Sequence, residues 1–189
     1  MKVTAIVLSA IVICLPVALR SQQVDDQHGV RDTVYADLSR IDSHNWSITV
    51  SYTNDEAVAG LTVPLRMSAG LNRIVADSAV YTGGRVDHFT LKAFRPDTAI
   101  QCVLLGMVAN LGPTFKRLEP GRGRLATIFV SSLDDNPIDS LVVDTATVPP
   151  GQQRLLSVAD ELQGTPPDTT RLDRDQVRIY PEFVIRYLK

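Results

Sequence analysis

The chain has 189 residues, of which 44% are hydrophobic and 21% are charged, and its formal net charge at pH 7 is −2. A chain of this size can bury roughly 70% of its unfolded surface in one core, so a single domain is the default expectation. The charge is mildly acidic and no basic block occurs. The sequence therefore lacks the electrostatic footprint of a nucleic-acid-binding protein, and we expect no nucleic acid partner.

The N-terminus has the layout of a secretory signal peptide. Lys2 supplies a short positive region, residues 5–19 form an uncharged apolar stretch, and Arg20 ends that stretch. The stretch is about 15 residues long, which is shorter than the ~20 that a bilayer-spanning helix needs. We therefore predict a signal peptide over residues 1–21 and a secreted, periplasmic or cell-surface protein with no membrane span after cleavage.

Two alternatives to a cleaved signal peptide stay open. The apolar stretch could remain as a membrane anchor, or Cys14 could carry a lipid. Lipidation fits less well, because Cys14 follows Ile11-Val12-Ile13, whereas a lipoprotein signal has a small residue directly before its cysteine.

Removal of residues 1–21 leaves 168 residues with 17 basic and 21 acidic side chains, a net charge of −4, because Lys2 and Arg20 are lost. Residues 22–33 are polar and predict a loose leader, so the folded domain is expected over residues 34–189. Cys102 is then the only cysteine, and no intrachain disulfide can form. It lies in an apolar run, which indicates a buried hydrophobic side chain rather than a reactive thiol.

From Val34 onward, large apolar residues alternate with small polar ones in short segments that turn residues separate. Because alternate residues of a strand share a face, each such segment predicts a half-buried strand. The alternation is clearest in residues 46–52. The large side chains of that segment fall on one face and are expected to point into a core: Trp46, Ile48, Val50 and Tyr52.

Three later segments add detail. Residues 61–67 alternate but contain Pro64, which cannot donate to a ladder and therefore predicts an edge strand or a bulge. His88 opens a further predicted strand over residues 88–94. Residues 99–109 are almost continuously apolar, which favours a central strand buried on both sides, although a helix also fits the length.

The remaining segments with strand character follow in chain order: residues 77–81, 124–131, 138–148, 155–158, 177–180 and 183–187. A spacing of ~8–12 residues with turn signals between strands is typical of a sandwich or a barrel. No stretch shows a sustained 3.6-residue apolar stripe. We therefore predict an all-β fold, a single antiparallel β-sandwich.

No catalytic constellation is recognisable. A catalytic triad needs a nucleophile, a base and an orienting acid, and no G-x-S-x-G elbow nominates a serine. His28 lies in the polar leader, His44 in a turn and His88 at a strand start. No H-x-x-x-H or C-x-x-C spacing supports a zinc site. We predict no catalytic residue and no cofactor, with a secreted enzyme of unrecognised type as an alternative.

Carboxylates cluster in the predicted loops, and calcium prefers such oxygen ligands on a tight loop. Asp134, Asp135 and Asp139 are weak candidates, because their loop lacks the D-x-[DN]-x-[DN]-G order and a closing glutamate. Asp173 and Asp175 have a D-x-D spacing but flank an arginine. Solvated turn residues are the favoured interpretation of all five.

Aromatic side chains on an exposed sheet would form a platform for a polysaccharide. The candidate ligand-binding residues are Tyr81, Phe94, Tyr180 and Tyr187, with Tyr35 in the same pool. Most of them occupy alternating positions that a core would claim. Neighbouring aromatics on a solvent-facing sheet would favour sugar binding, whereas a flat apolar sheet face would favour protein binding.

Two glycine-rich stretches and one glycosylation pattern have simple explanations. Residues 83–85 and 121–124 could suggest phosphate cradles, but predicted strands rather than helices follow them, so hairpin turns account for the glycines. Asn45-Trp46-Ser47 fits the N-glycosylation acceptor pattern. Such tripeptides are common by chance, and Trp46 is expected in the core.

Several strand-and-turn stretches together carry a family resemblance: Trp46 to Glu56, Val58-Ala59-Gly60-Leu61-x-Val63-Pro64-Leu65, Asp77 to Arg85, Pro120-Gly121-x-Gly123-x-Leu125-Ala126 and Pro181-Glu182-Phe183. Their order resembles the cohesin-like domains of bacterial surface and secreted proteins over roughly residues 45–187. The resemblance implies a jelly-roll sandwich of about nine strands. Some cohesins bind dockerin modules, and carbohydrate-binding modules share the architecture.

Together these observations predict a secreted or surface interaction module that is not catalytic and that binds an extracellular protein partner. The alternatives are a carbohydrate-binding module, which would bind a polysaccharide, and a secreted enzyme.

Overall fold

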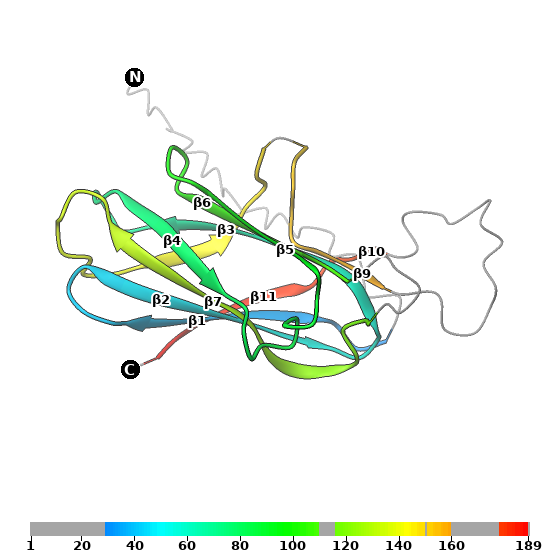
Figure 1. The fold of residues 1–189 in the computed structure, drawn as a ribbon. Helices are drawn as coiled ribbons and strands as arrows, with labels where there is room; N and C mark the ends of the chain where they lie inside the picture. The colour runs from blue at the N-terminus through cyan, green and yellow to red at the C-terminus, as the bar shows by residue number, and fades with distance from the viewer. Residues whose placement is uncertain (1–28, 110–115, 150, 160–177, 189) are drawn as a thin grey trace, which may run out of the picture.

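The computed structural model describes residues 29–109, 116–149, 151–159 and 178–188 (Figure 1). The predicted signal peptide, most of the polar leader, Cys14 and His28 lie outside the described residues, as do Asp173 and Asp175. Within the described part there is no helix that is long and apolar enough to cross a membrane.

Two sheets pack face to face and form a sandwich (Figure 1). The first sheet has the order β11-β1-β2-β7-β4, with the bounds Glu182–Tyr187, Thr33–Arg40, Asn45–Asn54, Gly121–Ser132 and Ile74–Val80. The second sheet has the order β10-β9-β3-β6-β5, with the bounds Arg178–Ile179, Leu156–Ala159, Val58–Ser68, Cys102–Val108 and Leu91–Asp97. The short strand β8 (Val142–Thr145) also pairs with β3.

The described residues thus contain eleven strands, and the predicted all-β sandwich is confirmed. Without β8, which lies off the main path, and the two-residue β10, nine strands remain, in agreement with the prediction. One pair departs from an all-antiparallel arrangement, because β11 runs parallel to β1. The chain reaches β11 from β10 in the opposite sheet, so a hairpin turn does not dictate its direction.

The alternation in β2 places side chains as predicted. Trp46, Ile48, Val50 and Tyr52 are all buried between the sheets, and Trp46 donates from its indole Nε1 to the Ile138 carbonyl at 3.1 Å. Burial of an aliphatic side chain such as Ile48 or Val50 stabilises the folded state by about 1.5–3 kcal/mol relative to leaving it exposed. The buried free thiol of Cys102 is likewise as predicted.

The turn between β1 and β2 is held by one carboxylate. Asp42 Oδ1 accepts from the backbone N–H of His44 at 2.7 Å and from that of Asn45 at 2.9 Å, and both Asp42 oxygens accept from the Asn45 side-chain amide. The amide of Asn45 and these backbone bonds lower the pKa of Asp42. The Asn45 amide nitrogen that glycosylation would modify is therefore occupied in the turn.

The prediction that Pro64 marks an edge strand or a bulge is wrong, because β3 is a central strand and its register shift lies between Val58 and Gly60. On one side β6 pairs with it throughout residues 60–66, and on the other side β9 pairs with residues 58–62 and β8 with residues 65–68. Pro64 lies in the gap between the β9 and β8 pairings. Its missing N–H therefore breaks no ladder bond, and its carbonyl still accepts from Ala146 at 3.3 Å.

Three other strand predictions need correction. The predicted strand over residues 88–94 begins only at Leu91, and His88 lies in a turn in which Phe89 N–H donates to the Val86 carbonyl. The segment over residues 138–148 contributes only β8. Gly121 and Gly123, predicted in a turn, are already part of β7.

Strand β6 is central as predicted, but it is not buried on both sides. Its inward residues Val103, Leu105 and Met107 are fully buried, whereas Leu104 and Val108 on the other face are half-buried. The continuous apolar run of residues 99–109 predicts a strand covered on both faces. In this fold one of those faces belongs to the outside of the sandwich.

Candidate functional site

The outward face of the second sheet is apolar, and the strand registers show how it is assembled. Across one row, Val158, Gly60, Val108 and Leu91 are aligned, and the next row aligns Leu156, Thr62, Gly106 and Ala93. A third row aligns Pro64 with Leu104. The apolar face denotes the residues of these three rows: Val158, Gly60, Val108, Leu91, Leu156, Thr62, Gly106, Ala93, Pro64 and Leu104.

The exposure of most of these residues matches their position on the outside, although Gly60 and Pro64 are buried. Leu91 is 62% exposed, whereas Ala93, Leu104, Val108, Leu156 and Val158 are half-buried. An antiparallel sheet that faces water on one side normally carries polar residues there. Contiguous exposed apolar surface with a polar rim instead marks an interaction site.

The outward face of the first sheet provides the contrast. Strand β2 presents Ser47, Thr49, Ser51 and Thr53 there, and all four are half-buried. On neighbouring strands, the Arg186 guanidinium forms an ion pair with both carboxylate oxygens of Asp37, at 2.5 and 2.7 Å. One sandwich therefore has one outward face on which polar side chains predominate, with Phe129 37% exposed among them, and one apolar outward face.

Two glycines lie in the middle of the apolar face, in adjacent central strands. A Cβ at Gly106 would meet the Ala93 Cβ at 3.5 Å, and a Cβ at Gly60 would meet the Met107 carbonyl at 3.6 Å, both ordinary contacts. Neither glycine has a positive φ. The fold therefore does not require glycine at either position. Glycine inside a strand often marks a place where another chain or a ligand approaches the backbone closely.

Charged residues border the apolar face at one end. In the row that follows Pro64, Asp144 of β8 is aligned with Arg66 of β3, and Asp97 of β5 is aligned with Cys102 of β6. Arg95 of β5 is exposed beside Leu104. An apolar centre with a polar border is the usual anatomy of a protein–protein interface.

The aromatic candidates do not form a platform among the described residues. Tyr81 and Phe94 pack against the hydrophobic core, and the Tyr81 hydroxyl donates to the Ala93 carbonyl at 2.9 Å. Tyr180 lies beneath the Arg154 guanidinium at 4.9 Å from its ring centroid. Tyr187 is 60% exposed at the end of β11.

Tyr35 lies on the other side of the first sheet from Tyr187. It is aligned with Val184 of β11, whereas Tyr187 is aligned with Leu38, whose side chain points into the core. The guanidinium groups of Arg186 and Arg122 lie 4.5 and 5.4 Å from the Tyr35 ring centroid. Arginines, rather than a second aromatic ring, therefore flank the half-buried Tyr35.

The calcium candidates lie in the exposed loop after β7. Asp134 accepts from the backbone N–H of Arg73 at 3.3 Å, and the Asp135 side chain is fully exposed. Asp139 is exposed as well. The structure places these residues at the end of the sandwich that also carries the turn between β1 and β2, because Ser132 N–H donates to the His44 carbonyl.

A different set of carboxylates comes together at the opposite end. Asp32, Asp55 and Glu56 each offer an oxygen, and these oxygens lie within 4.8 Å of one another, close enough to hold a divalent cation. Asp32 is fully buried and accepts from the Tyr52 hydroxyl and from Ser157 Oγ at 3.3 Å. Sequence reasoning missed this set, although Asp32 precedes β1 and Asp55 follows β2, and the antiparallel pairing of these strands brings the two together.

One serine, histidine and aspartate lie near one another without forming a triad. Ser43 Oγ is 2.8 Å from His44 Nδ1, and His44 Nε2 is 4.0 Å from Asp135, which is beyond hydrogen-bond distance. Ser43 and Asp135 are exposed and His44 lies between them in a surface turn. His88 is engaged elsewhere, because its Nε2 lies 2.9 Å from the Arg117 carbonyl.

The fold of this chain is cohesin-like. It is similar to the sixth cohesin of scaffoldin B from Acetivibrio cellulolyticus, solved with a Cel5 dockerin mutant, with a TM-score of 0.53, 5% identity, and coverage of 84% of this chain and 100% of that one. It is also similar to a Clostridium thermocellum structure described as the Coh-OlpC-Doc435 complex, with a TM-score of 0.51, 9% identity, and coverage of 85% and 96%. No family model and no curated protein sequence matches the chain.

Two buried tyrosines predict how stability responds to alkali. Burial raises the pKa of Tyr81 to about 12 and also raises that of Tyr52, where Asp32 adds to the effect. A tyrosine in the unfolded chain titrates near ~10. Above that pH the unfolded chain releases protons that the folded chain retains. Stability should therefore be insensitive to these groups below pH ~10 and fall as the pH rises toward the folded pKa values.

Urea unfolding at several pH values between about 8 and 11 measures this dependence. The Tyr81→Phe variant removes one of the two groups, so its stability should fall less steeply with pH than that of the parent chain. Equal slopes for the two chains would contradict the assignment.

Proposed function

We propose that this chain is an exported, non-catalytic interaction module that binds a protein partner through the apolar face of its second sheet. The observation that carries the proposal is the unequal character of the two outward faces. The apolar side chains in the rows between Leu91 and Val158 do not contribute to the core. The inward side chains of the same strands already fill the core. Burial against a partner would stabilise the complex by the usual hydrophobic term.

The cohesin-like fold supports the same conclusion. Both similar structures described above are of cohesins in complexes with dockerin partners. This chain shares their fold at a sequence identity of only 5% and 9%. We therefore propose a protein partner without specifying that the partner is a dockerin. Export is proposed from the signal-peptide pattern of residues 1–21.

Sugar binding is the less favoured alternative. A carbohydrate platform needs aromatic rings exposed side by side. Among the described residues the candidate rings are packed against the core or covered by arginine, or they lie on opposite sides of the first sheet. The proposal therefore assigns the polar outward face of the first sheet to solvent.

A charge placed on the apolar face tests the proposal. Val108→Glu, at a position whose neighbours across the sheet are Gly60 and Leu91, should weaken partner binding by roughly thirty-fold or more, because an unpaired carboxylate buried in an interface costs about 2 kcal/mol or more. Ser47→Glu on the outward face of the first sheet, where the aligned residues are Ser39 and Phe129, introduces the same charge and should leave binding unchanged. Both positions are half-buried on an outward face, so both variants should remain folded.

The partner is first captured from the extracellular and envelope proteins of the source organism, and its affinity for the two variants is then measured by calorimetry. A glycan array run with the same proteins gives the competing outcome. Specific binding to a polysaccharide, or equal partner affinity for the Val108→Glu and Ser47→Glu variants, would overturn the proposal.

A further inference from the structure

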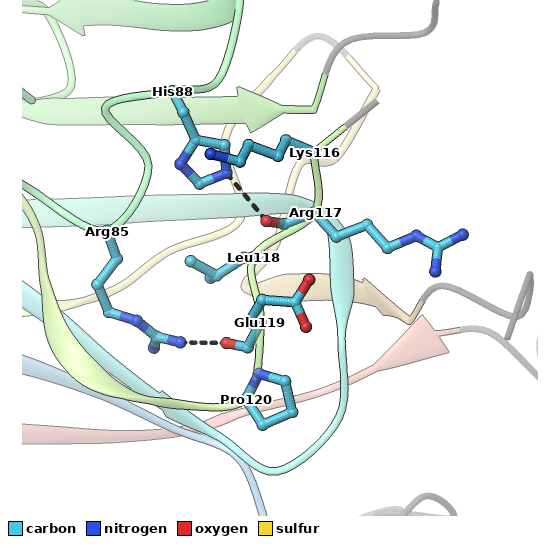
Figure 2. Close-up of a pocket in the computed structure, with 7 residues that line it drawn as sticks. All are labelled: Arg85, His88, Lys116, Arg117, Leu118, Glu119 and Pro120. Carbon is cyan, nitrogen blue, oxygen red and sulfur yellow. Dashed lines mark hydrogen bonds between the residues drawn. The ribbon is translucent and has the colours of Figure 1, made fainter. Parts of the chain in front are cut away.

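A pocket of about 320 Å³ lies outside the apolar face (Figure 2). One wall is the turn that contains Arg85 and His88, and the other wall is the segment over residues 116–120. The residues that line it include the cations Arg85, Lys116 and Arg117 and one carboxylate, Glu119. Figure 2 shows the Arg117 guanidinium pointing away from Arg85 and His88, so Arg85 and Lys116 are the two cations that face the pocket. This excess of positive charge contrasts with the net charge of −2 of the whole chain.

The walls of the pocket are fixed by backbone hydrogen bonds. Arg85 N–H donates to the Arg124 carbonyl at 2.7 Å, which attaches the turn to β7. Val58 and Leu118 exchange two bonds, at 2.9 and 3.0 Å, which attach the second wall to the start of β3. The imidazole of His88 also lies 2.9 Å from the Arg117 carbonyl and bridges the two walls (Figure 2). The pocket is therefore built before any ligand arrives.

Arg85 is a half-buried cation whose described partners are all neutral oxygens. Its Nη1 donates to the carbonyls of Tyr52 and Gly121 and to Asn54 Oδ1, and its Nη2 donates to the Glu119 carbonyl. These bonds leave the Nε–H and one Nη2–H of Arg85 without an acceptor among the described residues. Burial lowers the pKa of the guanidinium, because it removes water from around the charge, and the nearby Tyr52 and Asp32 partly oppose this effect.

The one carboxylate that lines the pocket does not neutralise this charge. Figure 2 shows the Glu119 carboxylate pointing away from the Arg85 guanidinium. Of the atoms of Glu119, the backbone carbonyl oxygen is the one that accepts from Arg85. Lys116 is exposed on the same pocket wall. Arg85 is a partly desolvated cation with neutral hydrogen-bond acceptors, and Lys116 lines the other wall of the same pocket without an acceptor among the described residues. An oxyanion would complete this arrangement, since charge-assisted hydrogen bonds are the strong ones.

We propose that this pocket binds a small oxyanion, a carboxylate or phosphate group, with Lys116 as the main ion-pair partner and Arg85 as the supporting cation. The site is separate from the apolar face, because none of its side chains belongs to the outward rows of the second sheet. Oxyanion binding at this pocket can therefore be tested separately from partner binding at the apolar face.

NMR titration of the purified protein with inorganic phosphate tests the proposal, and acetate at equal ionic strength is the second arm. We expect saturable shifts confined to residues 84–89 and 116–120, and the arm with the higher affinity identifies the class of oxyanion. Lys116→Gln should weaken the affinity about three- to five-fold, as expected for one solvent-accessible ion pair.

Arg73→Gln is the matched control, because it removes one exposed positive charge at the opposite end of β2 from the pocket. It should leave the affinity unchanged. Shifts that do not saturate with either anion, shifts spread over the whole surface, or equal weakening by Lys116→Gln and Arg73→Gln would each overturn the proposal.

Discussion

Replacement of Arg85 by methionine is expected to lower the free energy of unfolding by about 2–4 kcal/mol, because hydrogen bonds to charged groups each contribute about 1.5–3 kcal/mol and several are lost together. The guanidinium joins three parts of the chain: the end of β2 at Tyr52 and Asn54, the start of β7 at Gly121, and the preceding segment at Glu119. Methionine keeps most of the apolar stem but supplies no donor. The acceptors would then depend on water that has only partial access.

Arg85→Lys separates the loss of charge from the loss of geometry. Lysine keeps the charge, but one ammonium group cannot reach acceptors on all three segments. We therefore expect it to recover only part of the lost stability. Urea unfolding of the three chains measures the difference, and a lysine variant as stable as the parent would show that charge alone is what counts. A methionine variant as stable as the parent would remove the basis of the prediction.

Gly84→Ala should destabilise the protein by a similar amount, about 2–4 kcal/mol, in the range of overpacking and backbone strain. A Cβ at this position would lie 2.5 Å from the Leu125 carbonyl oxygen and 2.9 Å from that of Tyr81. Both are backbone atoms that cannot rotate away. The turn would have to move off β7, and the hydrogen bond from Arg85 N–H to the Arg124 carbonyl would lengthen.

Gly106→Ala is the matched control for this substitution. A Cβ there meets only the Ala93 Cβ, at 3.5 Å. Alanine also reduces the conformational entropy of the unfolded chain, so the variant should be unchanged or more stable by up to about 1 kcal/mol. Thermal or urea unfolding of the two variants compares them directly. Equal destabilisation would mean that backbone crowding at Gly84 does not limit this turn.

The candidate interaction site was only partly accessible from the sequence. The apolar run of residues 99–109 was visible, but it predicted a strand covered on both faces, and the structure leaves one face outward. The sequence identifies a residue as apolar, but it does not show whether another part of the protein covers that residue. The apolar face exists because β9, β3, β6 and β5 become neighbours, and three of these four strands are far apart in the chain.

The oxyanion pocket and the carboxylate set show the same limit. His88 was predicted at a strand start and Gly121 in a turn, so nothing connected Arg85 with residues 116–120. Asp32 was assigned to a loose leader, although the pairing of β1 with β2 places it next to Asp55 and Glu56. Both groupings depend on strand pairing between distant segments, which no local pattern encodes.

What the sequence determined by itself was the side of the sheet on which each residue of a regular strand lies. The two-residue period fixes this locally, and it correctly placed Trp46, Ile48, Val50 and Tyr52 in the core. Only the tertiary structure decided the neighbours of each strand. It places Pro64 in a central strand without the loss of a ladder hydrogen bond, and it aligns β11 parallel to β1. Alternation follows from the geometry of a single strand, whereas pairing is settled by the packing of the whole core.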